Sequence, residues 1–171
     1  MKGDLLVVNY FFSPASSRDK IVFGSERPGY DIQTWISFMR SRKIERVCCL
    51  LEQTTFIDEY NEAFGEENVK LAPIRDYHYS SRENLMQVII PFLSDSYIKN
   101  KPVVVHCMSG NGRTGHVMAA WLCYKYQLDP EQAINTIEKT GRNLREAIEL
   151  GYETLEKLIN LLDGCRNLGL K

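Results

Sequence analysis

Short apolar segments alternate along this chain with longer segments whose apolar residues recur at helical spacing. The short segments are rich in valine, isoleucine and aromatic residues, which favour strands. Residues 101–107 include three consecutive valines, a pattern typical of a strand that is buried on both faces. We expect strands at residues 5–12, 21–24, 45–51, 68–74 and 101–107.

The longer segments predict helices. Residues 28–29 form a Pro-Gly turn that leads into an amphipathic helix, and a polar helical segment runs through Tyr60. Residues 82–100 predict a helix that Pro91 should kink. Further helices are expected at about 113–126, from 129, and from about Leu144 into 152–164. The alternation predicts one domain over residues 1–171, of the α/β class, with a central, mostly parallel sheet flanked by helices on both faces.

Composition and charge narrow the function classes. The 171 residues are 44% hydrophobic and 25% charged, as in an ordinary soluble globular protein, and the formal net charge is -1. Such a balance lacks the basic footprint of a nucleic-acid or membrane-surface protein. The apolar run near the start is too short to span a membrane and lacks the cleavage pattern of a signal peptide. We therefore expect a cytoplasmic protein with no nucleic-acid or membrane partner. We also expect a monomer, although nothing in the composition or charge specifies the oligomeric state.

The five cysteines do not form a disulfide or zinc pattern. Their number is odd and no Cys-x-x-Cys spacing occurs, so each is treated as a free thiol, and we expect neither a metal nor another cofactor.

Cys107 stands apart because it ends the valine strand just before a glycine-rich loop and a helix. In α/β sheets ligands bind beyond the carboxyl ends of the strands. Successive N–H groups of such a loop can form an anion-binding nest facing the positive end of the helix dipole. We expect the loop to bind a tetrahedral phosphate through Met108, Ser109, Gly110, Asn111, Gly112 and Arg113.

This setting explains why a cysteine is present. A helix N-terminus and several N–H donors favour the thiolate, which can attack phosphorus and form a covalent intermediate. Arg113, six positions later, can grip two phosphoryl oxygens. The hydroxyl of Thr114, or of Ser109, could hydrogen-bond the sulfur, and His106 could fix the loop from behind.

The segment HCMSGNGRTG resembles the signature of the protein tyrosine phosphatase superfamily, in which His-Cys is followed by five residues, Arg, and Ser or Thr. The chain is similar to the compact, dual-specificity-like branch, and the likeness extends from GSERPGY through APIRDYHY to the helices after the loop. It implies the cysteine-phosphatase fold, Cys107 as the nucleophile and Arg113 as the phosphate-binding arginine.

The resemblance also implies an acid/base residue about thirty positions before the cysteine. Asp76 lies 31 positions upstream, directly after a predicted strand, and is the candidate general acid and base. A turn or helix cap is its alternative role. Asp58 and Asp95 fall on predicted helices and are worse placed. In relatives, a cysteine at the position of Cys49 traps an oxidised nucleophile as a disulfide; a packed core thiol is the alternative here.

Substrate class depends on the loop and on what the chain lacks. The loop carries no lysine, which disfavours phosphoinositides, and the chain has no recognisable segment that would build a deep aromatic slot. We therefore expect a metal-independent protein phosphatase acting on phosphotyrosine, and also on phosphoserine or phosphothreonine, in proteins or peptides. The alternatives are an RNA 5′-phosphate or phosphoinositide phosphatase, and a phosphate-binding module with little turnover. The water-positioning glutamine of many relatives has no clear counterpart here.

Overall fold

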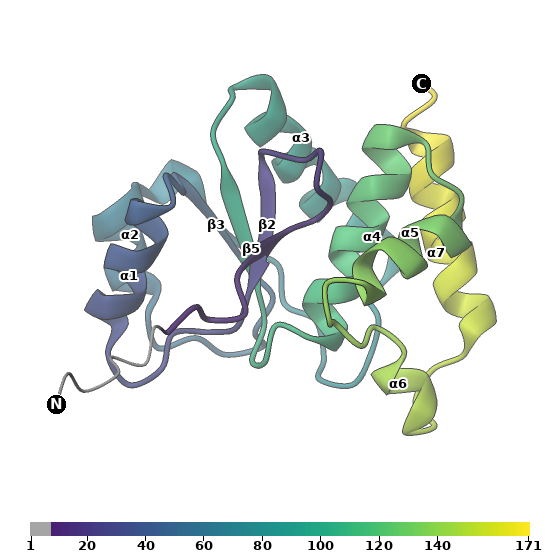
Figure 1. The fold of residues 1–171 in the computed structure, drawn as a ribbon, viewed down its shortest axis with the longest axis horizontal. Helices are drawn as coiled ribbons and strands as arrows, with labels where there is room; N and C mark the ends of the chain where they lie inside the picture. Colours follow the sequence, from purple (N-terminus) through teal and green to yellow (C-terminus); the bar gives the residue numbers. More distant parts are fainter. Residues whose placement is uncertain (1–7) are drawn as a thin grey trace, which may run out of the picture.

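A five-stranded sheet runs through the centre of the molecule in the computed structural model, which describes residues 8–171 (Figure 1). The strand order is β1-β2-β5-β3-β4; β1 is antiparallel to β2, and all other pairs are parallel. The predicted mostly parallel sheet is therefore confirmed. The strands are β1 (Ser13–Pro14), β2 (Val22–Ser25), β3 (Arg46–Cys49), β4 (Val69–Leu71) and β5 (Val103–His106).

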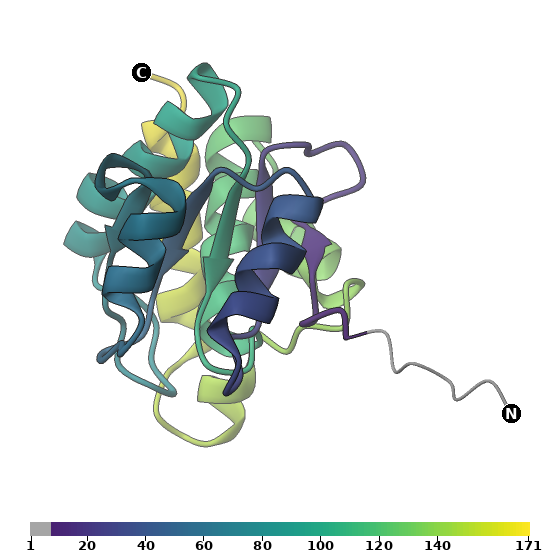
Figure 2. The ribbon, with the colours of Figure 1, turned by 90° about the vertical axis from the view of Figure 1, so that its left-hand side faces the viewer.

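Helices cover both faces of the sheet, as predicted. Figures 1 and 2 show α1 and α2 on one side and α3, α4, α5 and α7 on the other, with the short α6 at the end where β5 terminates. The helices are α1 (Ile32–Ser41), α2 (Ile57–Phe64), α3 (Ile90–Ile98), α4 (Gly112–Tyr126), α5 (Pro130–Glu138), α6 (Glu146–Glu149) and α7 (Leu155–Leu168), with one-turn helices η1 (Glu66–Asn68) and η2 (Asn84–Ile89). Within residues 8–171, no helix combines the length and apolar character needed to cross a membrane.

Two hydrophobic cores lie against the two faces of the sheet. Because side chains alternate along a strand, Val104 packs with Trp35 on the α1 side, whereas Val105 packs with Trp121 on the α4 side. Both tryptophans are fully buried. The helix α4 is itself buried from Arg113 to Cys123, which fixes its N-terminus rigidly at the end of β5.

The start of the chain departs from the sequence-based expectation. Of the strand predicted at residues 5–12, residues 5–7 lie outside the described part, and residues 8–12 form no strand. Tyr10 and Phe11 have positive φ values of 51° and 53°, so the chain turns here and pairs with β2 only from Ser13. An apolar run predicts burial, and Tyr10 is indeed buried. Packing of the side chain against the core, rather than strand pairing in the sheet, buries it.

The helix predicted from Leu144 is interrupted. The helix α6 ends at Glu149, Gly151 adopts a φ of +82°, and α7 begins after Thr154, whose side chain accepts a hydrogen bond from the Lys157 N–H. A left-handed glycine and a capping threonine are the usual signals of a helix end and a helix start. The break separates α6 from α7, and α6 lies beside the loop that follows β5 (Figure 1).

Pro91 changes the helix geometry one turn earlier than its own position. The segment η2 is a π-helical turn, in which the Ile90 N–H bonds the Leu85 carbonyl five residues back. A proline lacks the N–H of a normal helical bond, and a wider turn accommodates that loss. The chain then continues as α3 to Ile98.

Candidate active site

The loop between β5 and α4 is held from outside by hydrogen bonds to its carbonyl groups. Such bonds turn the carbonyls away from the loop centre and leave the N–H groups facing inward. In the described part of the chain, the N–H groups of residues 108–111 donate to no other protein group. The outer donors are His106 Nδ1, the Arg27 N–H and Arg142 Nη1, which bond the carbonyls of Cys107, Met108 and Gly110 respectively.

Gly110 allows the loop to pass close to β2. Its φ is +73°, in the left-handed region, and a Cβ there would stand 2.6 Å from the backbone of Ser25. A side chain would therefore meet both backbone strain and a steric clash. The position requires glycine for both reasons.

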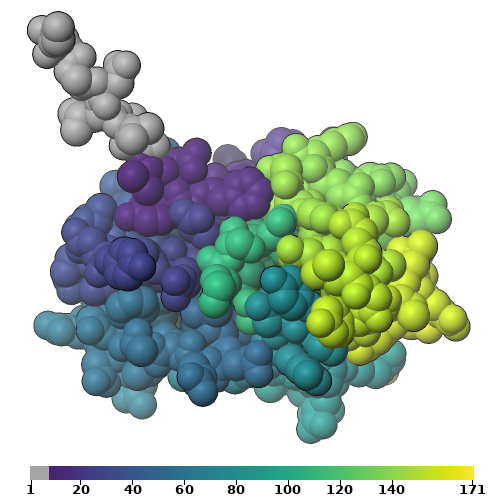
Figure 3. Space-filling model, turned by 90° about the horizontal axis from the view of Figure 1, so that it is seen from below, coloured from purple at the N-terminus to yellow at the C-terminus, as the bar shows by residue number. Residues whose placement is uncertain are grey.

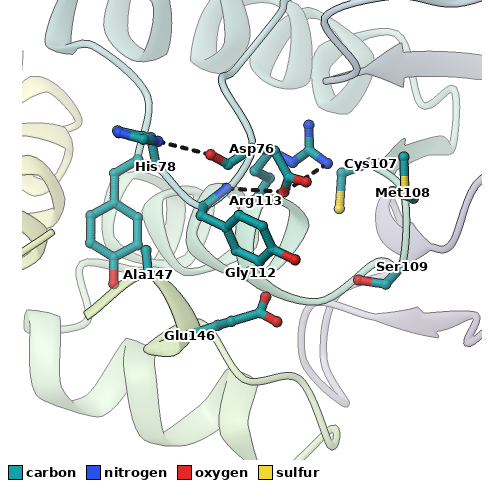
Figure 4. Close-up of a pocket in the computed structure, with 11 residues that line it drawn as sticks. Asp76, His78, Cys107, Met108, Ser109, Gly112, Arg113, Glu146 and Ala147 are labelled. Carbon is teal, nitrogen blue, oxygen red and sulfur yellow. Dashed lines mark hydrogen bonds and ion pairs between the residues drawn. The ribbon is translucent and has the colours of Figure 1, made fainter. Parts of the chain in front are cut away.

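Cys107 lies at the floor of a pocket of about 220 Å³ (Figure 4). Its side chain is buried, and Thr114 Oγ1 donates a hydrogen bond to Cys107 Sγ over 3.1 Å. Of the two hydroxyls considered from the sequence, Thr114 is the one that reaches the sulfur. Ser109 lines the pocket instead.

Arg113 and Asp76 meet beside Cys107. The Arg113 guanidinium is buried and lies 3.2 Å from Asp76 Oδ1, while its other terminal nitrogen donates to the Ile74 carbonyl over 3.2 Å. Asp76 sits in the loop after β4, half exposed, and lines the same pocket (Figure 4). The structure thus brings together Cys107, Arg113, Thr114 and Asp76, four residues that the sequence singled out.

The Asp76 loop is anchored to the neighbouring loop after β3. Glu52 Oε1 accepts a hydrogen bond from the Asp76 N–H over 3.1 Å, and Asp76 Oδ1 accepts one from the Tyr77 N–H over 2.9 Å. These bonds aim the carboxylate at Arg113. The two other aspartates considered do not line the pocket: Asp58 lies in α2, and Asp95 pairs with Arg46 and Lys99.

His106 supports the loop from behind, as the sequence suggested. It is fully buried, and burial lowers its pKa to about 4, so the ring is neutral at neutral pH. Because a carbonyl only accepts hydrogen bonds, Nδ1 donates to the Cys107 carbonyl over 3.0 Å, and Nε2 accepts from the Tyr60 hydroxyl over 3.0 Å. The buried ring thereby holds the backbone of Cys107 in place.

Cys48 and Cys49 occupy opposite faces of β3, as alternation along a strand predicts. Cys48 packs in the core on the α4 side and Cys49 in the core on the α1 side. Burial raises the pKa of the Cys49 thiol to about 11. That value disfavours a thiolate at Cys49, and its redox pairing with Cys107 stays a prediction.

Three residues that contact the site carried no recognisable sequence signal. Arg142 reaches the loop from the segment before α6 and is fully buried. Glu146 of α6 lines the pocket, and His116 of α4 bonds the Gly112 carbonyl through Nδ1 and the Ser80 N–H through Nε2. Lone Arg, Glu and His residues are common in any chain, so only folding marks these three.

Comparisons with known proteins agree with this geometry. Residues 24–127 match a family model described as polymorphic toxin system, DSP-PTPase phosphatase. Dual specificity protein phosphatase 6 of Homo sapiens is 26% identical over 120 residues, which cover 69% of this chain and 32% of that protein. The chain spans about a third of the length of the curated relatives that it matches first.

Solved structures share the fold. Tk-PTP in its active form is 25% identical with a TM-score of 0.66, covering 87% of this chain and 93% of that one. PTPMT1 in complex with PI(5)P has a TM-score of 0.73 at 16% identity, covering 94% of this chain and 97% of that one. The predicted cysteine-phosphatase fold is therefore confirmed.

Proposed function

We propose a substrate class for this chain, which belongs to the DSP-PTPase phosphatase family of polymorphic toxin systems and is a protein-tyrosine or dual-specificity phosphatase. Its substrates are phosphotyrosine, and also phosphoserine and phosphothreonine, in proteins or peptides. The reaction proceeds through a phosphocysteine intermediate without a metal ion or other cofactor. Cys107, Arg113, Asp76 and Thr114 carry it.

In the first step, Cys107 Sγ attacks phosphorus while the bond from phosphorus to the ester oxygen breaks. The inward N–H groups of residues 108–112 and the Arg113 guanidinium hold the phosphoryl oxygens and stabilise the charge of the transition state. Asp76, protonated at this stage, gives its proton to the leaving oxygen. The product alcohol then leaves the pocket.

In the second step, water attacks the phosphocysteine and the bond between phosphorus and sulfur breaks. Asp76, now ionised, takes the proton of the attacking water. The hydrogen bond from Thr114 to the sulfur stabilises the departing thiolate. Inorganic phosphate is released and Cys107 returns to its starting state.

One observation carries this proposal: the 3.2 Å contact between Arg113 and Asp76 beside Cys107. The two residues come from different loops, 37 positions apart in sequence. A carboxylate that served only as a turn or helix cap would have no reason to meet the arginine of the phosphate loop. The contact supports a role for Asp76 next to the bound phosphate.

We also propose that the chain acts as one phosphatase domain, residues 1–171. Arg142 and Glu146 lie beyond the segment that matches the family model, yet they contact the loop or line the pocket. A cytoplasmic location and a monomeric state remain predictions, as does the lack of a nucleic-acid or membrane partner. Phosphoinositides, RNA 5′-phosphates and simple phosphate binding without turnover are the competing activities.

The decisive experiment measures the hydrolysis of a phosphotyrosyl peptide against pH, without added metal, for the parent, Cys107→Ser and Asp76→Asn. We expect a bell-shaped profile on the acid side of neutral for the parent and no turnover for Cys107→Ser. Asp76→Asn should lose about 100-fold in kcat together with the alkaline limb of the profile, because the proton donor is gone.

Asp58→Asn provides a matched control, since it removes an exposed aspartate outside the pocket and should keep the parent profile. Phosphothreonyl peptides, PI(5)P vesicles and RNA 5′-phosphates, assayed in parallel, rank the substrate classes. Tight binding of phosphopeptide by a parent that does not turn it over would establish a binding module and refute the proposed enzyme mechanism.

A further inference from the structure

Glu146 places a carboxylate in the pocket of the phosphate loop. It belongs to α6, and Figure 4 shows its carboxylate pointing into the pocket from the side opposite Asp76. Its Oε2 lies 3.2 Å from the position that a Cβ on Gly112 would occupy, so it packs on the first residue of α4. The carboxylate therefore stands directly beside the loop that would hold phosphate.

This carboxylate is not neutralised by a neighbour. Among residues 8–171, no hydrogen bond or ion pair joins it to another side chain. The other acidic residues of the same segment differ: Glu149 accepts from Asn143 Nδ2 over 3.0 Å, and Glu153 pairs with Lys157 over 2.8 Å. The charge of Glu146 is thus free to act on whatever enters the pocket.

The charges around the pocket are unbalanced toward the negative. Arg113 is the one Lys or Arg side chain among the eleven lining residues, and it already faces Asp76. Glu52 adds a carboxylate in the adjoining cavity, which Asp76 and Arg113 also line. Burial, and then the charges of Asp76 and Glu149, raise the pKa of Glu146, while the charge of Arg113 opposes this shift. The lining thus supplies one cationic side chain, which suits a single phosphate.

We propose that Glu146 is a specificity-determining residue that disfavours phosphomonoesters with a second negative group near the scissile phosphate. This inference rests on the proposed function and deepens it. Substrates with neutral or cationic neighbours are accepted, whereas acidic flanking residues or a second phosphate are disfavoured. The repulsion acts on the part of the substrate just outside the loop. Figure 3 shows the loop at the molecular surface, between α6 and the segment around residue 76.

The size of the effect follows from the partial exposure of the site. Charges near a protein surface interact across a medium of high effective dielectric constant, so the discrimination should be about three- to tenfold in kcat/KM. Because salt screens such interactions over about 8 Å at physiological ionic strength, the discrimination should shrink as salt is added. A preference based on shape alone would not respond to salt.

The test compares two phosphotyrosyl peptides that differ only in having Gln or Glu on both sides of the phosphotyrosine. We expect the parent to prefer the Gln-flanked peptide, and Glu146→Gln to bring the ratio of the two kcat/KM values close to one. Glu149→Gln removes the same charge from the same helix outside the pocket and should keep the parent ratio. Equal kcat/KM values for the two peptides in the parent, or the same ratio in Glu146→Gln, would overturn the proposal.

Binding of both peptides to Cys107→Ser gives a second readout that needs no turnover. Glu146→Gln in that background should raise the affinity for the Glu-flanked peptide about three- to tenfold relative to the Gln-flanked one. If the parent hydrolyses neither peptide but Glu146→Gln shifts the ratio of the two binding affinities, the catalytic proposal fails while the role of Glu146 holds. If hydrolysis depends on Cys107 but neither ratio shifts, only the role of Glu146 fails.

Discussion

At the scale of single residues, Arg142 is the least expected feature of the site. It is fully buried and pairs with no carboxylate among residues 8–171, and burial lowers its pKa to about 10, so it remains charged at neutral pH. Its terminal nitrogens donate to the carbonyls of Gly110, Phe11 at 2.6 Å and Gly24 at 3.1 Å, and to the Ser13 hydroxyl at 3.0 Å. Its Nε is buried with no hydrogen-bond partner among residues 8–171. It also stacks on the Phe11 ring, 4.2 Å from its centroid. A buried cation is costly, and here it joins the phosphate loop to β2 and the start of the described chain.

Replacing Arg142 should therefore weaken phosphate binding. Without the guanidinium, the Gly110 carbonyl loses its outer donor and can turn inward toward the anion. We expect Arg142→Met to raise the inhibition constant for inorganic phosphate about tenfold and to lower the free energy of unfolding by about 1–3 kcal/mol. Arg145→Met is the control, because Arg145 pairs with Glu138 away from the pocket. An unchanged phosphate constant in a folded Arg142→Met variant would contradict this role.

At the scale of elements, the loop between β5 and α4 depends on the elements that surround it. The strand β5 is central in the sheet and α4 is buried, so both ends of the loop are rigid. The middle of the loop passes over β2 at Gly110. Its shape therefore results from packing on three sides as well as from its own glycines.

Gly110→Ala should displace this loop while the sheet and helices remain. The added Cβ would force a residue with φ of +73° against the Ser25 backbone at 2.6 Å. We expect loss of phosphate binding, measured by calorimetry, with helical circular dichroism retained. Gly29→Ala, where a Cβ meets nothing within 4 Å, should bind phosphate as the parent does. Parent-like phosphate affinity in Gly110→Ala would show that the loop tolerates the shift.

At the scale of the whole molecule, two buried histidines link stability to pH. Burial lowers the pKa of both His106 and His116 to about 4, against about 6.5 in the unfolded chain. Between these two pH values the unfolded state binds more protons, so stability rises with pH. The contribution is fully present above about pH 6.5 and is lost as the pH falls to about 4. Protonated His116 would also be unable to accept from the Ser80 N–H.

We therefore expect the free energy of unfolding to fall steeply as the pH drops from 6.5 to 4. Each histidine contributes on the order of 3 kcal/mol to this fall. Urea unfolding at a series of pH values should show a shallower slope for His116→Gln than for the parent. His78→Gln, which removes a less buried imidazole, should keep the parent slope. Identical slopes for His116→Gln and the parent would show that His116 is not responsible.

The sequence by itself determined the parts of this protein that depend on local pattern. The alternation of short apolar and helical segments along the chain predicted the fold class. The valine strand, the glycine-rich loop and the following helix are contiguous, so residues 103–126 predicted the cysteine at the functional end of the strand. Alternation along β3 likewise predicted the opposite faces of Cys48 and Cys49. Even Asp76, which is distant in sequence, followed from the family resemblance, and the structure places it beside Arg113.

Only the tertiary structure decided what depends on contacts between distant segments. The break between α6 and α7 brings Glu146 to the pocket, and the turn at Tyr10 and Phe11 lets Arg142 bond the start of the described chain. No spacing rule links these residues to Cys107, because they meet it through packing rather than through a shared helix or strand. The residues that give the loop its chemistry are thus consecutive in the sequence. The residues that hold the loop in place and set the charge of its pocket come from distant segments and meet it only on folding.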